Sequence, residues 1–128
     1  MSEFEAKNEK EIIRPARVKY NPTDEEYELD FDRESVVFAQ RSGFVIDDID
    51  SKPNIVIPEL FYYAMRKNHK RLARNQVEAI RKKLFPDGIP QMLLRRLTDL
   101  YYQAAYTELI YDEEEEPEKN SQTVVELD

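Results

Sequence analysis

Apolar and polar residues alternate with a period of two near the N-terminus and follow a helical period over most of the remaining chain. The alternation covers parts of Ala16–Tyr20 and Glu26–Phe31, a pattern typical of half-buried strands. The sequence Asn21-Pro22-Thr23-Asp24 between them suits a turn, because proline fixes φ and asparagine can bond its own backbone. We predict a β-hairpin whose apolar face packs on a helix, since two strands alone are marginally stable.

A first helix is predicted over Arg33–Arg41, with Asp32 as its N-cap. Its expected inward-facing residues are Val37 and Phe38. The pair Gly43-Phe44 should end it, because glycine can adopt the left-handed conformation and a following apolar residue can fold back on the helix.

Six consecutive apolar or aromatic residues, Leu60–Met65, predict a central helix that is apolar on all sides. The pattern allows two starting points: Ile55 after an Asn54 cap, or Pro58 in the first helical position. Such a helix must be covered on several sides. Either the rest of the chain wraps it, or part of it is left for a partner.

A third helix should start at the capping-box spacing Asn75-Gln76-Val77-Glu78 and end at Pro86-Asp87-Gly88. We expect the basic run Arg81–Lys83 to face water. The predicted apolar stripe consists of Val77, Ala79 or Ile80, and Leu84.

The last predicted helix is the longest, Pro90–Asp112, and it has two apolar faces. The first face has core spacing and consists of Leu93, Leu94, Leu97, Leu100, Tyr101, Ala104 and Ala105. The second stripe consists of Met92, Tyr102, Tyr106 and Ile110. It is covered either by more of this chain or by another copy or another protein, and the pattern leaves both open.

These elements predict a mainly helical α+β fold, in which an N-terminal β-hairpin precedes about four helices. We expect a mobile arm at residues 1–14, a single folded domain at residues 15–112 and a disordered acidic tail at residues 113–128.

Composition narrows the possible functions. The chain has 19 Lys and Arg against 27 Asp and Glu, a net charge of −8 and a pI near 4.8, which argues against nucleic acid or anionic lipid binding over the whole surface. It has no cysteine, which excludes disulfides and thiol catalysis. No apolar run is long enough for a membrane span, and the polar N-terminus is unlike a signal peptide, so we expect an intracellular protein without membrane contact.

The sequence offers little for catalysis, and we predict no enzyme, no cofactor and no metal site. His69 is the only histidine and lies among basic residues, where a surface imidazole is the simpler interpretation. Two glycines cannot form a phosphate-binding loop. Three aspartates in the loop Val45–Pro53 favour a solvated acidic loop, because their spacing is not that of a calcium loop.

A basic segment, residues 66–83, supports a competing hypothesis, a small nucleic-acid-binding regulator. It contains eight cationic residues against one acid, and the other interpretation is a solvated face that meets the acidic tail or an acidic partner. The eight residues are Arg66, Lys67, Lys70, Arg71, Arg74, Arg81, Lys82 and Lys83.

The order of elements and several short runs resemble the tail assembly chaperones of long-tailed bacteriophages over roughly Val18–Leu109. The likeness lies in the strand pair leading to Phe31-Asp32-Arg33, the helix end at Gly43-Phe44, the proline-containing acidic loop, the Leu60–Ala64 run with its trailing Lys67-Asn68-His69, and Leu97–Tyr101 in the last helix. It rests on layout and not on a strict motif.

The resemblance implies a non-enzymatic protein of the host cytoplasm, absent from the finished virion. It implies binding to the phage tape measure protein, with the tail tube protein and a second copy of the chain as further partners, and a phage neck or connector component is the alternative. Exposed apolar surface and adaptable methionines suit such a client. The expected contacts are Phe61, Tyr62, Tyr63, Met65, Met92, Tyr102, Tyr106 and Ile110.

Overall fold

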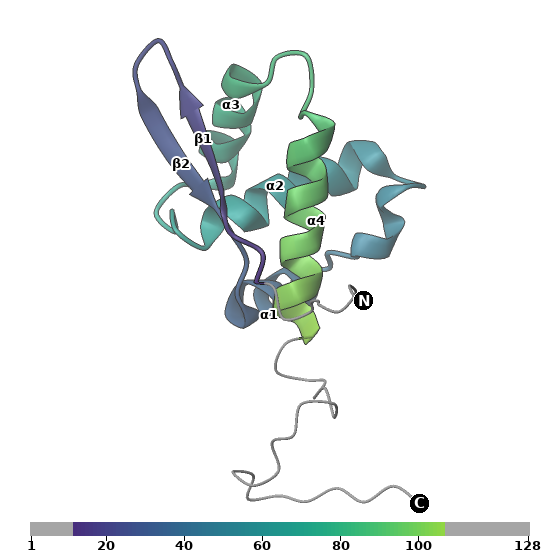
Figure 1. Ribbon diagram of the computed structural model, residues 1–128. Helices are drawn as coiled ribbons and strands as arrows, with labels where there is room; N and C mark the ends of the chain where they lie inside the picture. Colours follow the sequence, from purple (N-terminus) through teal and green to yellow (C-terminus); the bar gives the residue numbers. More distant parts are fainter. Residues whose placement is uncertain (1–11, 107–128) are drawn as a thin grey trace, which may run out of the picture.

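A computed structural model describes residues 12–106, and it has the predicted α+β architecture of a hairpin followed by four helices. The two strands lie side by side at one side of a group of helices, and α4 crosses in front of α2 (Figure 1). The elements are β1 (Ala16–Tyr20), β2 (Glu25–Leu29), α1 (Arg33–Arg41), the 3₁₀ helix η2 (Ile46–Ile49), α2 (Pro53–Arg66), α3 (Arg74–Leu84) and α4 (Gln91–Tyr106). The predicted arm and tail lie largely outside the described residues.

The hairpin is antiparallel, and its register pairs Ala16 with Leu29 and Tyr20 with Glu25. As predicted, it packs on helices: β2 contacts α2, and β1 contacts α4. The second strand is shorter than predicted and ends at Leu29. The reason is that the next amide, Asp30 N, donates to the carbonyl oxygen of Ala64 in α2 at 3.1 Å instead of continuing the ladder.

Both predicted ends of α1 are present. The Asp32 carboxylate accepts from Ser35 N at 2.8 Å, and Ser35 Oγ accepts from Asp32 N at 2.8 Å, which makes a capping box. At the other end Gly43 has φ +98°, and Phe44 N donates to the Ala39 carbonyl oxygen at 3.0 Å. This is a Schellman end, and the buried Phe44 ring is its apolar contact.

The predicted inner face of α1 was wrong by one position. Val36 and Ala39 are buried, whereas Val37 is half-buried and Phe38 is exposed. The residues that face the core are Val36 and Ala39, which are one helical turn apart. The Phe38 ring instead lies beneath the guanidinium of Arg66, whose Cζ is 3.7 Å from the ring centroid.

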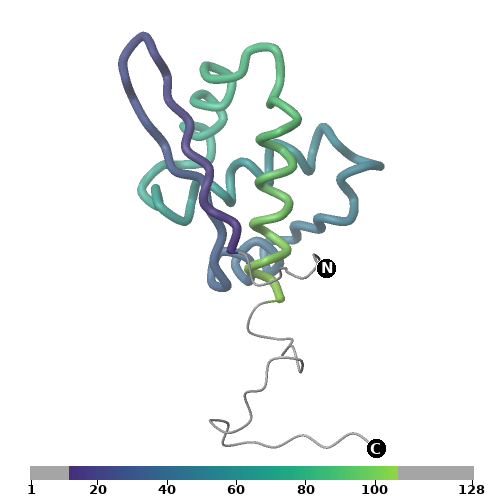
Figure 2. The backbone as a smooth tube through the Cα atoms, in the orientation of Figure 1, coloured from purple at the N-terminus to yellow at the C-terminus, as the bar shows by residue number. Residues whose placement is uncertain are grey.

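Helix α2 is the centre of the fold and contacts α1, η2, α3, α4 and β2. The tube view shows it running behind α4 (Figure 2). It starts at Pro53, earlier than either predicted start, and Pro53 occupies the first helical turn where its missing N–H is not needed. Pro58 is therefore inside the helix and leaves the Asn54 carbonyl oxygen without its usual helical donor.

The all-round apolar run of α2 is covered by the chain itself. Five of its six residues, all except Tyr62, are buried. A chain of edge-to-face rings continues from Tyr63 toward α4. The ring centroid of Phe44, in the loop after α1, lies 5.5 Å from that of Tyr63 and 5.4 Å from that of Tyr101, and the Phe31 centroid lies 5.3 Å from that of Tyr101.

Helix α3 is capped differently from the prediction. Its N-cap is Ala73 and not Asn75, and Gln76 Oε1 accepts from Ala73 N at 2.7 Å, which gives one half of a capping box. Val77 is buried and Ile80 half-buried, whereas Ala79 is exposed, so the alternative with Ile80 is the correct one. Arg81 does not simply face water, because its guanidinium pairs with the Glu78 carboxylate.

Helix α4 begins at Gln91, one residue after Pro90, and its predicted continuation to Asp112 lies beyond the described residues. Its core face is confirmed, with Leu97, Leu100, Tyr101 and Ala104 buried. None of the helices within residues 12–106 has the length and apolar character needed to cross a membrane.

We expect Leu60→Ala to lower the free energy of unfolding by about 2–5 kcal/mol, because the fully buried side chain would leave a cavity at the centre of the helix that every layer contacts. Ile55→Ala on the same helix is the matched control. Its side chain is 58% exposed, so the change should stay within about 0.5 kcal/mol. Urea denaturation of both variants measures the difference, and equal losses would contradict α2 as the centre of the core.

Candidate interaction groove

Exposed apolar side chains gather where α4 passes the loop after α1. Tyr102 and Tyr106 of α4 are 39% and 50% exposed, and Val45 of the loop is 49% exposed. A monomeric domain usually leaves apolar residues scattered singly, so a cluster with a hollow beneath it is the feature most suggestive of binding.

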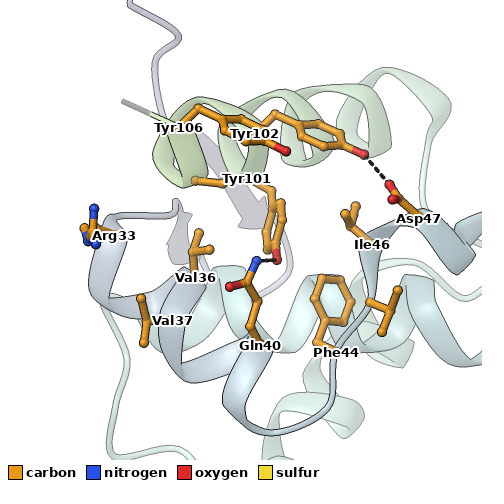
Figure 3. A pocket seen from close by; sticks show the side chains of 12 residues that line it. Arg33, Val36, Val37, Gln40, Phe44, Ile46, Asp47, Tyr101, Tyr102 and Tyr106 are labelled. Atoms are coloured by element: carbon orange, nitrogen blue, oxygen red, sulfur yellow. Dashed lines mark hydrogen bonds between the residues drawn. The ribbon is translucent and has the colours of Figure 1, made fainter. Parts of the chain in front are cut away.

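The hollow is a groove of about 270 Å³ between α1, η2 and α4 (Figure 3). Its walls are mostly aliphatic and aromatic, with Arg33 and Asp47 as the two charged side chains. The lining residues are Arg33, Val36, Val37, Gln40, Phe44, Val45, Ile46, Asp47, Tyr101, Tyr102, Ala105 and Tyr106.

Two tyrosines form one wall of the groove. The Tyr102 and Tyr106 rings are parallel, with centroids 6.3 Å apart, as expected for side chains one helical turn apart (Figure 3). The Tyr102 hydroxyl donates to Asp47 Oδ1 at 3.1 Å, which connects α4 to η2 and fixes the ring at the groove's edge. The wall is therefore preformed, so a ligand would not need to order it.

A partly buried hydrogen bond holds the floor of the groove. Tyr101 reaches from α4 toward α1, where Gln40 Nε2 donates to its hydroxyl at 3.1 Å (Figure 3). Burial raises the pKa of Tyr101, because the phenolate would lose its hydration. Burial, and then the hydrogen bond to Asp47, likewise raise the pKa of Tyr102.

The size and chemistry of the groove suit side chains of a partner. A cavity of about 150 Å³ can hold a benzene molecule, so this groove has room for one or two large apolar side chains. It is smaller than the roughly 300–1,000 Å³ typical of small-molecule sites. Its lining contains no histidine, serine or lysine that could act as a nucleophile or a neutral-pH base.

The structure separates the contact residues predicted from sequence into different places. Phe61, Tyr63 and Met65 are fully buried in the core, where no partner reaches them without unfolding α2, so they cannot form a binding surface in this fold. Tyr102 and Tyr106 line the groove. The remaining three residues are Met92, which is exposed but outside the groove, Tyr62, which is half-buried elsewhere, and Ile110, which lies outside the described residues.

Tyr62 belongs to a second, more open hollow of about 410 Å³ between α2 and α3. The Arg74 guanidinium covers its ring at 4.2 Å and also donates to the Tyr63 hydroxyl at 3.3 Å. Arg74 thereby fills part of the space between the two helices, and its Nη1 atom lies 4.0 Å from Glu59 Oε2. This hollow lies at the junction of the two helices, and the half-exposed Arg74 side chain forms part of its lining.

Sequence reasoning missed the groove's α1 and loop walls. Val37 was assigned to the core, and Val45 and Ile46 were treated as part of an acidic loop. Two apolar residues next to Phe44 were a usable signal, because a purely solvated loop has no need of Val45-Ile46 beside an already buried aromatic residue.

The basic segment is largely used inside the fold. Five of its eight cations have partners on other side chains: Lys67 pairs with Asp30 at 2.7 Å, Lys83 with Glu25 at 2.9 Å, and the three arginines 66, 74 and 81 contact rings or carboxylates described above. The hydrogen bond to Asp30 raises the pKa of Lys67. A phosphate backbone would have to compete with these contacts, which weakens the nucleic-acid hypothesis.

His69 has a structural contact with the hairpin. Glu28 N donates to His69 Nε2 at 3.3 Å, and the Tyr27 ring lies edge-on at 5.6 Å. Within residues 12–106 no group of three or more histidine and carboxylate side chains is placed to hold a metal ion.

Comparison with known proteins gives a family but no activity. The family model described as "Domain of unknown function (DUF5055)" matches residues 6–127, nearly the whole chain, and the protein belongs to this family. No curated protein matches the chain, and no solved structure matches it.

We expect Asp47→Asn to lower the pH at which Tyr102 ionises, because the variant lacks the carboxylate that opposes the phenolate. Because the pKa of Tyr102 is higher in the folded than in the unfolded chain, the group stabilises the fold at pH values below the unfolded-state pKa, near 10. This stabilisation is lost as the pH rises through the folded-state pKa. Absorbance titration of the phenolate band measures the shift, which should vanish in a Tyr102→Phe background. Asp50→Asn, an equal charge change in the same loop, is the control, and an equal shift there would refute a specific contact.

Proposed function

We propose that this member of the DUF5055 family is a non-enzymatic binding protein that holds apolar side chains of a helical client in the groove between α1, η2 and α4. The observation that supports this most directly is the preformed apolar wall of Tyr102 and Tyr106, exposed on a domain in which the other large rings of residues 12–106, apart from Phe38, are buried or half-buried. An amphipathic helix presents apolar side chains at intervals of three and four residues, and one or two of them fit the volume of the groove.

The resemblance to tail assembly chaperones makes the phage tape measure protein the client we propose. That protein is long, helical and prone to aggregate, and a small factor with a short apolar groove can mask one apolar stretch of it per copy. The charge of the chain supports the same role. Residues 107–128 contain nine acids and one lysine, whereas residues 12–106 contain 14 acids and 16 cations. Strong negative charge in the sequence after residue 106 would help to keep a complex with an aggregation-prone client in solution.

We expect Tyr106→Glu and Val45→Glu to weaken client binding by tenfold or more, because each places a carboxylate against the apolar wall and would bury it in the complex. Ile55→Glu is the matched control: it alters an equally exposed apolar residue that does not line the groove, so binding should be retained. The measurement is the soluble fraction of a phage tape measure protein on co-expression with this chain, followed by co-purification.

Thermal unfolding of each variant would show that the fold is intact, since all three positions are exposed. The chaperone role would be abandoned if the unaltered chain gave neither a complex nor a gain in client solubility. A virion neck component shares the binding chemistry but stays in the particle, so mass spectrometry of purified virions decides between the two.

A further inference from the structure

The groove lies where the described chain ends. Tyr106, the last described residue, is one of its lining residues, so the following segment starts at the groove's edge. Twenty-two residues follow, and the family model extends through them to residue 127. Any apolar part of this segment is therefore tethered within a short distance of an apolar hollow.

The distal part of that segment has one apolar cluster. Within residues 112–128 the only large aliphatic side chains are Val124, Val125 and Leu127, and they follow the acidic run Asp112–Glu118. Glu126 and Asp128 flank Leu127. The lining has one cation, Arg33 of α1, and one anion, Asp47 of η2, and each also interacts with another part of the chain. Acids beside Leu127 would be attracted to the Arg33 side and repelled from the Asp47 side, which gives one preferred orientation.

The tether makes even a weak contact effective. Residues 107–123 separate the groove from Val124, and a random-coil linker of that length would have an end-to-end distance of about 20–25 Å. The effective concentration of the cluster at the groove is then on the order of millimolar. A contact with a dissociation constant near 1 mM would fill the groove in about half of the molecules.

We propose that residues 124–127 of the same chain occupy the groove in the free protein and leave it when a client binds. The three aliphatic side chains would cover the Tyr102 and Tyr106 wall, shielding it from water and from other copies. For client binding the segment acts as an internal competitor, and this part of the proposal rests on the function proposed above; the occupancy itself does not.

The test is nuclear magnetic resonance on the full-length chain. Because the protein has no cysteine, Gln122→Cys carries a single nitroxide label next to the cluster without altering it. The label should broaden the amide signals of groove residues such as Val37, Val45 and Tyr106, and should spare Ala79 on the exposed face of α3. The triple variant Val124→Ser, Val125→Ser, Leu127→Ser should remove the broadening without changing the net charge.

The matched control replaces three acids of the tether, Glu113→Gln, Glu114→Gln and Glu115→Gln, and should leave the broadening in place. Loss of broadening in this control, with retention in the serine variant, would mean that the acidic run docks on the protein, and would overturn the proposal. Broadening between a labelled chain and a separate isotope-labelled chain would assign the groove to a second copy and would also overturn it. If the label on the unaltered segment broadened no groove signal, the proposal would also be overturned.

The serine variant should also bind client about twofold to tenfold more tightly, because its groove is always open. Failure of the two proposals can be told apart. Groove broadening with no client complex would support occupancy by residues 124–127 and refute the chaperone role. A client complex with no groove broadening would support the chaperone role and refute the occupancy.

Discussion

The fold depends on the burial of a helix that is apolar on every side. The run Leu60–Met65 has apolar side chains on every face, so α2 has to be covered on several sides, and α1, η2, α3, α4 and β2 all contact it. The hairpin, which would be marginal alone, gains its apolar support from α2 and α4. Even the end of β2 is set by this helix, through the bond from Asp30 N to Ala64.

This constraint also determines which apolar surface is left over. Phe61, Tyr63 and Met65 are buried in the core. The Phe44 ring, in the loop after α1, makes edge-to-face contacts with Tyr63 of α2 and with Tyr101 of α4. Within residues 12–106 the exposed apolar residues that share one hollow are Val45, Tyr102 and Tyr106, where α4 passes the loop after α1, whereas Ile55 and Met92 are exposed outside that groove. The surface available to a partner is thus more local than the aromatic content of the chain suggests, and it favours recognition of a few side chains over the coating of a long client by a broad face.

The charges of the chain divide in a similar way. Four of the eight cations of residues 66–83 join elements. Lys67 pairs the end of α2 with Asp30 after β2, Lys83 pairs α3 with Glu25 of β2, Arg74 lies across the junction of α2 and α3, and Arg66 of α2 covers a ring of α1. The net negative charge comes from the sequence outside residues 12–106. Residues 12–106 are by contrast nearly neutral, with 14 acids and 16 cations.

The sequence alone determined the elements whose signals are local. The hairpin turn, the Asp32 cap, the Gly43-Phe44 end and the core face of α4 all follow from residue types within a few positions of one another, and all were predicted. The tertiary structure decided the rest. Whether Tyr63 or Tyr106 is exposed, which way α1 turns, and that Val45 and Ile46 form a groove wall depend on how α1, η2 and α4 meet. The residue pattern within one segment cannot predict how these elements pack. Their arrangement depends on contacts between residues far apart in the sequence, such as Gln40 and Tyr101, which are 61 positions apart.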